Sequence, residues 1–148
     1  VSRINHPRER VYEGECIMVV LRKREPEKLT FSLKELLGTW SENAKMFQPG
    51  ETVTGTARSI ETYGVFVELT PNLAGLAEPC DYLFEGQRVA VYIKSVLPDK
   101  MKIKLVIVEA FEEAEMAQDL TYFVNAQHID RFDYSPPGAP KVISTVFE

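Results

Sequence analysis

The sequence predicts a mainly β protein organised around a small closed or nearly closed barrel of five strands. Two observations support this fold class. Short segments of alternating apolar and polar residues follow one another within about 60 residues, from Glu51 to Ile107, with turn-forming residues between them. Helical spacing of apolar residues is confined to a short stretch before them. Five short strands in so little chain favour closure of the sheet.

The first two strands already contain the most informative residue, Phe66. One face of the first strand carries Val53, Gly55 and Ala57, and one face of the second carries Val65, Val67 and Leu69. Phe66 falls on the opposite, outward face of the second strand, just after Tyr63 and the permissive Gly64. An aromatic ring on the wet face of a small sheet is a candidate stacking platform for bases. The alternative is a minor core, in which a helix or loop covers Phe66.

The remaining barrel strands follow in order. A turn at Pro71-Asn72 leads into a short strand from Leu73 to Ala77, and residues 79–86 form a loop. Residues 89–94 and 101–107 then alternate as two further strands.

An ungapped internal similarity relates residues 14–33 to residues 86–105, at an offset of 72 positions. Gly14, Pro26, Lys28 and Leu33 coincide with Gly86, Pro98, Lys100 and Leu105, and Ile17, Val19, Leu21, Leu29 and Phe31 coincide with Val89, Val91, Ile93, Met101 and Ile103. Each copy therefore reads as two strands joined by a Pro-containing turn. A period of this length suggests tandem small domains rather than a solenoid.

The first copy is expected to be truncated. Residues 51–85, which are strand-like, precede the second copy, whereas only residues 1–13 precede the first. A two-stranded ribbon is marginal alone, and its open edges seek partners. We expect residues 11–33 to pack on the rest of the chain, such as the C-terminal extension, or on a second chain.

The segment between the two copies predicts a linker helix from Ser32 to Phe47. Its apolar residues recur at helical spacing: Leu33, Leu36, Leu37, Trp40, Ala44 and Phe47. Ser32 with Glu35 reads as a capping box, Gly38 is expected to weaken or break the helix, and Thr39 with Glu42 to restart it. The apolar stripe is typical of core or inter-domain packing.

The C-terminal extension predicts a small α+β unit that packs somewhere. An acidic, helix-prone stretch covers residues 109–120, and residues 121–124 are strand-like. A loop through residues 136–138 leads to a β-prone segment at residues 142–147.

Composition is that of a globular protein, with 45% hydrophobic and 26% charged residues among 148. The net charge of −5 is uneven, because residues 111–148 hold two basic side chains against seven acidic ones, and residues 1–49 hold nine against seven. This is not the strongly basic footprint of a typical nucleic-acid domain, so phosphate contacts must come from a local patch. No apolar run approaches the roughly 20 residues that span a bilayer. Cys16 and Cys80 lack metal-type spacing, and reduced thiols suggest a cytoplasmic protein.

Residues 50–110 resemble the S-one type RNA-binding domain, the repeat of small-subunit ribosomal protein one. The matching motifs are G-E-T-V-T-G-T-A-R-S-I from Gly50, Y-G-V-F-V-E-L from Tyr63, G-L-A-E from Gly75, E-G-Q-R-V-A-V-Y-I from Glu85 and M-K-I-K-L from Met101. Residues 1–37 resemble the C-terminal half of a preceding repeat, residues 32–49 a helical linker, and residues 111–148 a C-terminal extension. The sequence departs from the pattern at three places. Glu78 stands where many members carry a histidine, the Asp before the last strand is matched only loosely by Asp99 beside Pro98, and Leu105-Val106 replaces the usual L-S.

The resemblance implies a five-stranded OB-fold Greek-key barrel that binds single-stranded RNA across its second and third strands. Carried over by position, Tyr63 and Phe66 match the two aromatic positions of the family's binding face, and Lys102 a basic position on the last strand. Physical chemistry supports the same face. The residues expected to bind RNA are Tyr63, Phe66, Arg58, Tyr92, Lys94, Lys102 and Lys104. The alternative for the lysines is solubilisation of a barrel wall.

No residue pattern supports catalysis, a metal site or a cofactor. His6 and His128 are far apart in sequence and lack a nucleophile partner or metal-type spacing. Two functions of different classes remain. The first is a non-enzymatic RNA-binding module of a ribosomal-protein-one-like chain, acting in translation or RNA metabolism, with the ribosome as a further partner and no membrane. The second is a protein–protein docking module on an OB scaffold. A tail that covers Tyr63 and Phe66 would favour the second.

Overall fold

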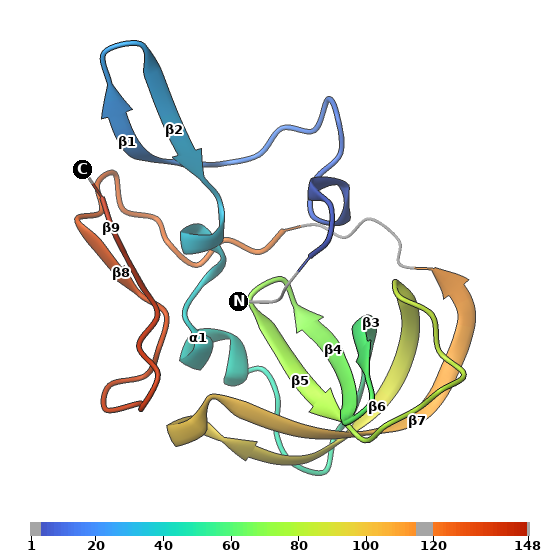
Figure 1. Ribbon diagram of the computed structural model, residues 1–148. Helices are drawn as coiled ribbons and strands as arrows, with labels where there is room; N and C mark the ends of the chain where they lie inside the picture. The colour runs from blue at the N-terminus through green and yellow to red at the C-terminus, as the bar shows by residue number, and fades with distance from the viewer. Residues whose placement is uncertain (1–3, 115–119, 148) are drawn as a thin grey trace.

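A closed barrel of five strands forms the centre of the computed structural model, which describes residues 4–114 and 120–147. Its strands are β3 (Thr52–Glu61), β4 (Gly64–Thr70), β5 (Leu73–Ala77), β6 (Gln87–Leu97) and β7 (Lys102–Ala114). They close in the order β3-β4-β5-β7-β6 (Figure 1). Strands β5 and β7 pair in parallel, and every other neighbouring pair is antiparallel. The predicted fold class is confirmed, since this is the order and closure of an OB-fold barrel.

The barrel core consists of the apolar side chains that alternate along these strands. Val65, Val67, Leu73, Val89, Val91, Ile93, Ile103 and Leu105 are almost fully buried. The interior is narrow, because a Cβ atom at Gly75 would lie 2.6 Å from the Leu105 side chain. The period-2 pattern in the sequence therefore identified the inward faces of β4, β6 and β7 correctly.

The segment before the barrel forms a short 3-10 turn and a separate hairpin. The turn, η1 (Pro7–Glu9), is followed by β1 (Val20–Glu25) and β2 (Lys28–Ser32), which pair antiparallel. The hairpin projects away from the barrel at the upper left of Figure 1. Its apolar side chains are exposed, so the first repeat copy folds as the expected ribbon without a core of its own.

The linker is helical in two pieces. The 3-10 helix η2 (Lys34–Leu37) ends at Gly38, whose φ of 96° is a conformation that glycine adopts readily, and helix α1 (Trp40–Ala44) follows. Thr39 caps α1, with the Glu42 amide donating to Thr39 Oγ1 at 3.1 Å and the Thr39 amide donating to Glu42 Oε1 at 3.0 Å. The predicted break and restart are confirmed. The capping box predicted for Ser32 and Glu35 does not form. The Ser32 hydroxyl donates to the Glu35 carboxylate instead, and the first turn of η2 has no side-chain cap.

The prediction of a helix over residues 109–120 is wrong for its first part. Strand β7 continues to Ala114, because β6 pairs with it as far as Gln87, and the Gln87 amide group donates to the Phe111 carbonyl oxygen at 2.8 Å. Pairing with a neighbouring strand overrides local helix propensity here. Residues 115–119 lie outside the described residues.

The C-terminal extension is a loop and a hairpin that pack on the linker. Strands β8 (Arg131–Asp133) and β9 (Ser144–Val146) pair antiparallel, and residues 121–124 form no strand, contrary to expectation. The Phe123 amide instead donates to the Leu36 carbonyl oxygen at 2.8 Å, and the Trp40 amide donates to the Tyr134 carbonyl oxygen at 3.0 Å. The extension thus packs within the molecule, with α1 between β8–β9 and the barrel (Figure 1).

Candidate nucleic-acid interface

Tyr63 and Phe66 form an aromatic pair where β3 turns into β4. Their ring centroids lie 6.2 Å apart, with an edge-to-face angle of 82° between the planes. The Tyr63 residue is 62% exposed, and Phe66 is partly exposed. Gly64 lies between them, where a Cβ atom would stand 2.6 Å from the Ala77 carbonyl oxygen. A side chain at residue 64 would therefore collide with β5, and glycine avoids this.

Strand register extends this pair into a row of outward residues. Phe66 on β4 is opposite Leu76 on β5, and Leu76 is opposite Lys104 on β7. Leu76 is also exposed, although its position on a short central strand gave no sign of it. An aromatic ring, an aliphatic side chain and an ammonium group thus lie on three adjacent strands.

The other predicted lysines flank Lys104. Lys102 precedes it on the same outward face of β7, and both are exposed. On β6, Ser95 pairs with Lys104 and Ile93 with Leu105, so Lys94 is the extra residue of a β-bulge beside them.

Tyr92 completes the predicted set on β6, opposite Val106, and is 40% exposed. Six of the seven predicted residues therefore lie on the outer wall of the barrel: Tyr63, Phe66, Tyr92, Lys94, Lys102 and Lys104. Tyr92 and Lys94 lie on β6, which is separated from β4 by β5 and β7 on one side of the barrel and by β3 on the other. They therefore extend the row of outward residues and do not face the aromatic pair.

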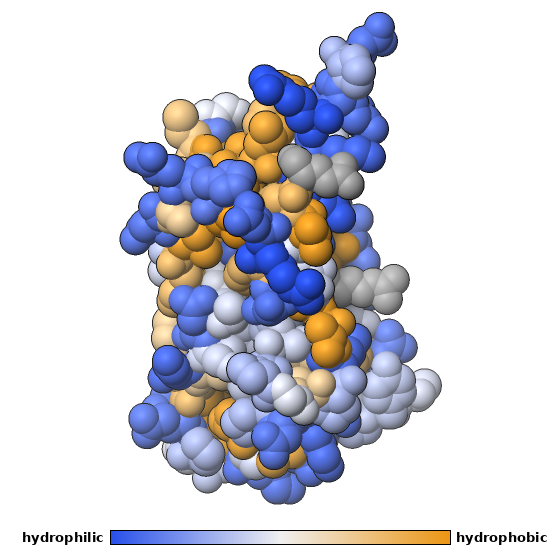
Figure 2. All heavy atoms as spheres, turned by 90° about the vertical axis from the view of Figure 1, so that its left-hand side faces the viewer, coloured by the Kyte–Doolittle hydropathy of each residue, from blue (hydrophilic) through white to orange (hydrophobic). Residues whose placement is uncertain are grey.

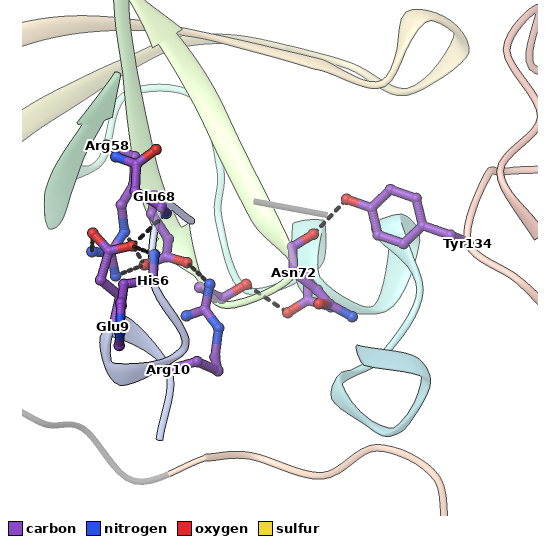
Figure 3. Close-up of polar contacts among 10 residues, drawn as sticks. His6, Glu9, Arg10, Arg58, Glu68, Asn72 and Tyr134 are labelled. Atoms are coloured by element: carbon purple, nitrogen blue, oxygen red, sulfur yellow. Dashed lines mark hydrogen bonds and ion pairs between the residues drawn. The ribbon is translucent and has the colours of Figure 1, made fainter. Parts of the chain in front are cut away.

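Arg58 does not join the predicted phosphate-binding side chains. It is 5% exposed, and its Nε and Nη2 atoms donate to Glu68 Oε2 at 2.9 and 2.6 Å. On the other side of the same carboxylate, Arg10 Nη2 donates to Glu68 Oε1 at 2.6 Å, and Glu9 Oε1 lies 3.6 Å from Arg58 Nη1 (Figure 3). Arg58 thus holds the N-terminal turn to the barrel instead of facing solvent.

Sequence parity misplaced Arg58 because β3 is irregular there. Its pairing with β4 shifts register between Ala57 and Ser59, and Arg58 is the extra residue. A bulge redirects a side chain in a way that strict alternation cannot anticipate.

Glu9 is the member of this network whose ionisation is perturbed. Partial burial opposes its charge, but the amides of His6 and Asn5 donate to its carboxylate and the Arg58 and Arg10 guanidiniums attract it. The net effect lowers the pKa of Glu9 below its usual value. The carboxylate is therefore held in its charged form.

Sequence reasoning missed a groove next to the aromatic pair. The β3–β4 turn and the loop after β5 enclose about 560 Å³. Its lining residues are Ile60, Glu61, Thr62, Pro79, Cys80 and Asp81. Two exposed aromatic residues, Tyr82 and Phe84, follow in the same loop. The signal for them was present as D-Y-L-F, but a loop offers no periodicity from which exposure can be deduced.

The described part of the C-terminal extension, residues 120–147, packs against the linker and the turn after β4, and Tyr63 stays 62% exposed. The Tyr134 hydroxyl donates to the carbonyl oxygen of Asn72, in the turn between β4 and β5, and burial raises the pKa of Tyr134. That turn follows the last residue of β4, whereas Tyr63 precedes its first residue. The hydrogen bond of Tyr134 therefore lies away from the aromatic pair.

Two negative findings concern the part of the chain that the structure describes. No cluster of three His, Cys, Asp or Glu side chains in residues 4–114 and 120–147 is arranged to hold a metal ion. Within the same residues, the helices are all too short or too polar to cross a bilayer.

Comparison with known proteins gives consistent relatives. No family model matches the chain. It is 28% identical over 132 residues to the small ribosomal subunit protein bS1 homolog of Bacillus subtilis, a match that covers 80% of this chain and 35% of that protein. With small ribosomal subunit protein bS1 of Staphylococcus epidermidis it shares 30% identity over 126 residues, covering 72% and 32%. The chain thus spans about a third of the length of these relatives.

Two solved structures are also similar in part. One is an uncharacterized protein of Methanocaldococcus jannaschii, with a TM-score of 0.38, 29% identity and coverage of 40% of this chain and 89% of that one. The other is GSP13 of Bacillus subtilis, with a TM-score of 0.38, 25% identity and coverage of 47% and 65%. The sequence relatives confirm the resemblance predicted from the motifs: this chain is a homologue of the ribosomal proteins named bS1.

Proposed function

We propose that the chain is a single-stranded RNA-binding module of a ribosomal-protein-one-like polypeptide, acting in translation or RNA metabolism. The observation that carries this proposal is the Tyr63–Phe66 pair, with Tyr63 exposed and Phe66 partly exposed, which continues through Leu76 to Lys104 on an OB-fold wall. Homology to proteins named small ribosomal subunit protein bS1 supports a role without catalysis, with RNA and the ribosome as partners in the cytoplasm.

The chemistry of this wall suits RNA without strict sequence preference. Base stacking on an aromatic side chain contributes roughly 1–3 kcal/mol and accepts every base. The ammonium groups of Lys94, Lys102 and Lys104 neutralise phosphates and release counterions, which makes affinity fall with salt. Because the chain as a whole is acidic, binding by this single barrel is weak.

The test is fluorescence anisotropy of a labelled pyrimidine-rich 12-mer RNA at two salt concentrations. Phe66→Ala is expected to weaken binding by about fivefold or more, the lower end of the stacking range. Phe31→Ala is the matched control, because Phe31 is an exposed ring on the β1–β2 hairpin, away from the barrel wall. Equal affinity of the wild type and Phe66→Ala would exclude this face as the binding site.

We also propose a second function, protein docking, for the β1–β2 hairpin. In the second repeat copy, Val91, Ile93 and Ile103 are at most 1% exposed, because β3, β4 and β5 cover them. Their counterparts in the hairpin are exposed by 43% at Val19, 38% at Leu21 and 55% at Phe31. Apolar surface is open in the upper half of Figure 2, on the side of the molecule where the hairpin lies.

Among the described residues, Tyr122 of the C-terminal extension accepts a hydrogen bond from the Met18 amide at 3.1 Å, while Val19, Leu21 and Phe31 stay exposed. An apolar surface is therefore the partner that fits, and the same hairpin of a second copy presents one through Val19, Leu21 and Phe31. Concentration-dependent sedimentation that Phe31→Asp suppresses would support docking of a second copy. Sedimentation as a monomer at every concentration would exclude it.

A further inference from the structure

We propose that residues 5–10, the N-terminal strap, form an autoinhibitory contact that competes with RNA for the β3 end of the barrel wall. The inference rests on the proposed RNA-binding function and adds a control to it. The strap consists of η1 and the residues on either side of it, and its side chains bind β3 and β4 from outside the barrel (Figure 3). Release of the strap would lengthen the surface on which a single strand can lie.

The strap is bound to three elements of the barrel, each through one side chain. The contacts are Asn5 Nδ2 to Glu85 Oε2 at 3.2 Å, in the loop before β6, Glu9 Oε1 to Arg58 Nη1 at 3.6 Å, on β3, and Arg10 Nη2 to Glu68 Oε1 at 2.6 Å, on β4. Pro7 and Arg8, at the centre of the strap, are exposed. A segment held by a few polar contacts, with little buried apolar surface, opens at a low cost in free energy.

The strap closes the β3 end of the row of outward residues that runs from Phe66 to Lys104. Ser59 on β3 is opposite Phe66, and Arg58 is the extra residue beside Ser59. Glu68 shares the outward face of β4 with Phe66 and lies two residues further along, about 7 Å at the rise of an antiparallel strand. An OB fold binds about 4–16 nucleotides, so a bound strand extends beyond the aromatic pair. A strand that stacks on Phe66 and continues toward β3 therefore meets the strap.

At this end of the row, the strap presents a carboxylate where a phosphate would bind. A guanidinium binds carboxylates and phosphates with the same donor geometry. Glu9 Oε1 lies on one side of the Arg58 guanidinium, and Glu68 Oε2 accepts from it on another at 2.6 Å. The amides of Asn5 and His6 donate to Glu9 Oε2, at 2.6 and 3.0 Å, and orient this carboxylate. Glu9 and an RNA phosphate therefore compete for the same side of Arg58, and their like charges repel each other.

The test measures the affinity of a variant with a loosened strap for the labelled pyrimidine-rich 12-mer, by anisotropy. Asn5→Ala and Glu9→Gln, combined in one chain, remove the contact with Glu85 and the charge that faces Arg58. Glu13→Gln is the matched control for charge, because Glu13 follows the strap closely and its side chain is 88% exposed. The double variant is expected to bind RNA about two- to fivefold tighter than Glu13→Gln, since partly exposed ion pairs shift an equilibrium by about that factor.

A second measurement uses the wild-type chain, because coupling between two binding events is reciprocal and RNA must loosen the strap. The Arg10 amide donates to the Pro7 carbonyl oxygen at 3.0 Å, and its hydrogen exchange is expected to be faster in the RNA complex than in the free protein. The Ala139 amide, which donates to the Pro136 carbonyl oxygen at 3.2 Å in the C-terminal extension, is the control and should exchange equally in both.

Equal affinities of the double variant and Glu13→Gln would overturn the competition, and RNA binding itself would stand if Phe66→Ala still weakens it. Slower exchange of the Arg10 amide in the complex, or weaker binding by the double variant, would also overturn it, by showing that the strap is part of the RNA site. Absence of binding by the wild type and the double variant alike would refute the proposed function.

Discussion

Arg58 and Glu68 face each other across β3 and β4, with guanidinium Nη2 2.6 Å from carboxylate Oε2 and both side chains at most 5% exposed. Arg10, from the segment before the hairpin, binds the other oxygen of the same carboxylate. One buried anion therefore joins two strands of the barrel to the N-terminal turn. Charges removed from water in this way are stable only while each keeps its partner.

Glu68→Leu is expected to destabilise the protein by about 3–5 kcal/mol, because it leaves two guanidinium groups near the barrel wall without their shared anion. Urea unfolding, followed by the fluorescence of the single and buried Trp40, measures the loss. The double variant with Arg58→Met is expected to recover much of it, since both charges of the inner pair are then absent.

A different result for an Arg58 variant would show that Arg58 contacts RNA. If Arg58→Met left stability unchanged but weakened RNA binding and its salt dependence, the guanidinium would have to reach phosphate in solution. We expect the reverse: a large loss of stability, and no specific change in the salt dependence of RNA binding once the variant is folded.

The lowered pKa of Glu9 predicts acid-dependent attachment of the N-terminal turn. A group whose pKa is lower in the folded state binds fewer protons there than in the unfolded chain. Its stabilisation is therefore complete above the unfolded value of 4.5 and is lost as pH falls through the folded value. We expect the urea midpoint of the wild type to fall more steeply below about pH 4.5 than that of Glu9→Gln.

Glu13→Gln is the matched control for this titration. Glu13 also pairs with an arginine, Arg8 at 3.3 Å, but both side chains are largely exposed. Exposed pairs contribute little, so the pH dependence of Glu13→Gln should follow the wild type. Identical profiles for Glu9→Gln and the wild type would show that the turn is not held by this carboxylate.

How far the sequence could predict this structure depends on whether a feature is local. Alternation placed Val65, Val67, Ile103 and Leu105 in the core correctly, because a strand repeats every two residues whatever its neighbours are. The linker break at Gly38 was equally local. In contrast, residues 109–114 are helix-prone in isolation and became strand only because β6 continues beside them.

The candidate site was predictable to the same extent. Tyr63, Phe66 and the β7 lysines follow from parity on regular strands. The position of Arg58 does not follow from parity, because a bulge in β3 turns its side chain toward Glu68. The groove is formed by a turn and a loop that are about 20 residues apart in sequence, and their proximity depends on barrel closure rather than on any local pattern.

The two repeat copies predict opposite responses to the same substitution. Ile103→Asp would bury an unpaired carboxylate in the barrel and is expected to prevent folding, since Ile103 is 1% exposed. Phe31→Asp, at the aligned position of the hairpin, is expected to change stability by no more than about 0.5 kcal/mol, because Phe31 is 55% exposed. Thermal unfolding followed by circular dichroism distinguishes the two. Strong destabilisation by Phe31→Asp would mean that the hairpin face is already covered in solution.

The salt dependence of RNA binding by Lys104→Gln distinguishes two roles of Lys104, contact with a phosphate and solubilisation of the barrel wall. Each phosphate neutralised on a single strand contributes about 0.7 to the slope of log affinity against log salt. Lys104 is opposite Leu76, in the row that begins at Phe66, so the variant should lose about that much slope. Lys28→Gln, in the exposed hairpin, removes the same charge away from the barrel wall and should keep the slope of the wild type. If both variants keep it, Lys104 serves only to solubilise the barrel wall, and the phosphates of the bound strand must follow another path.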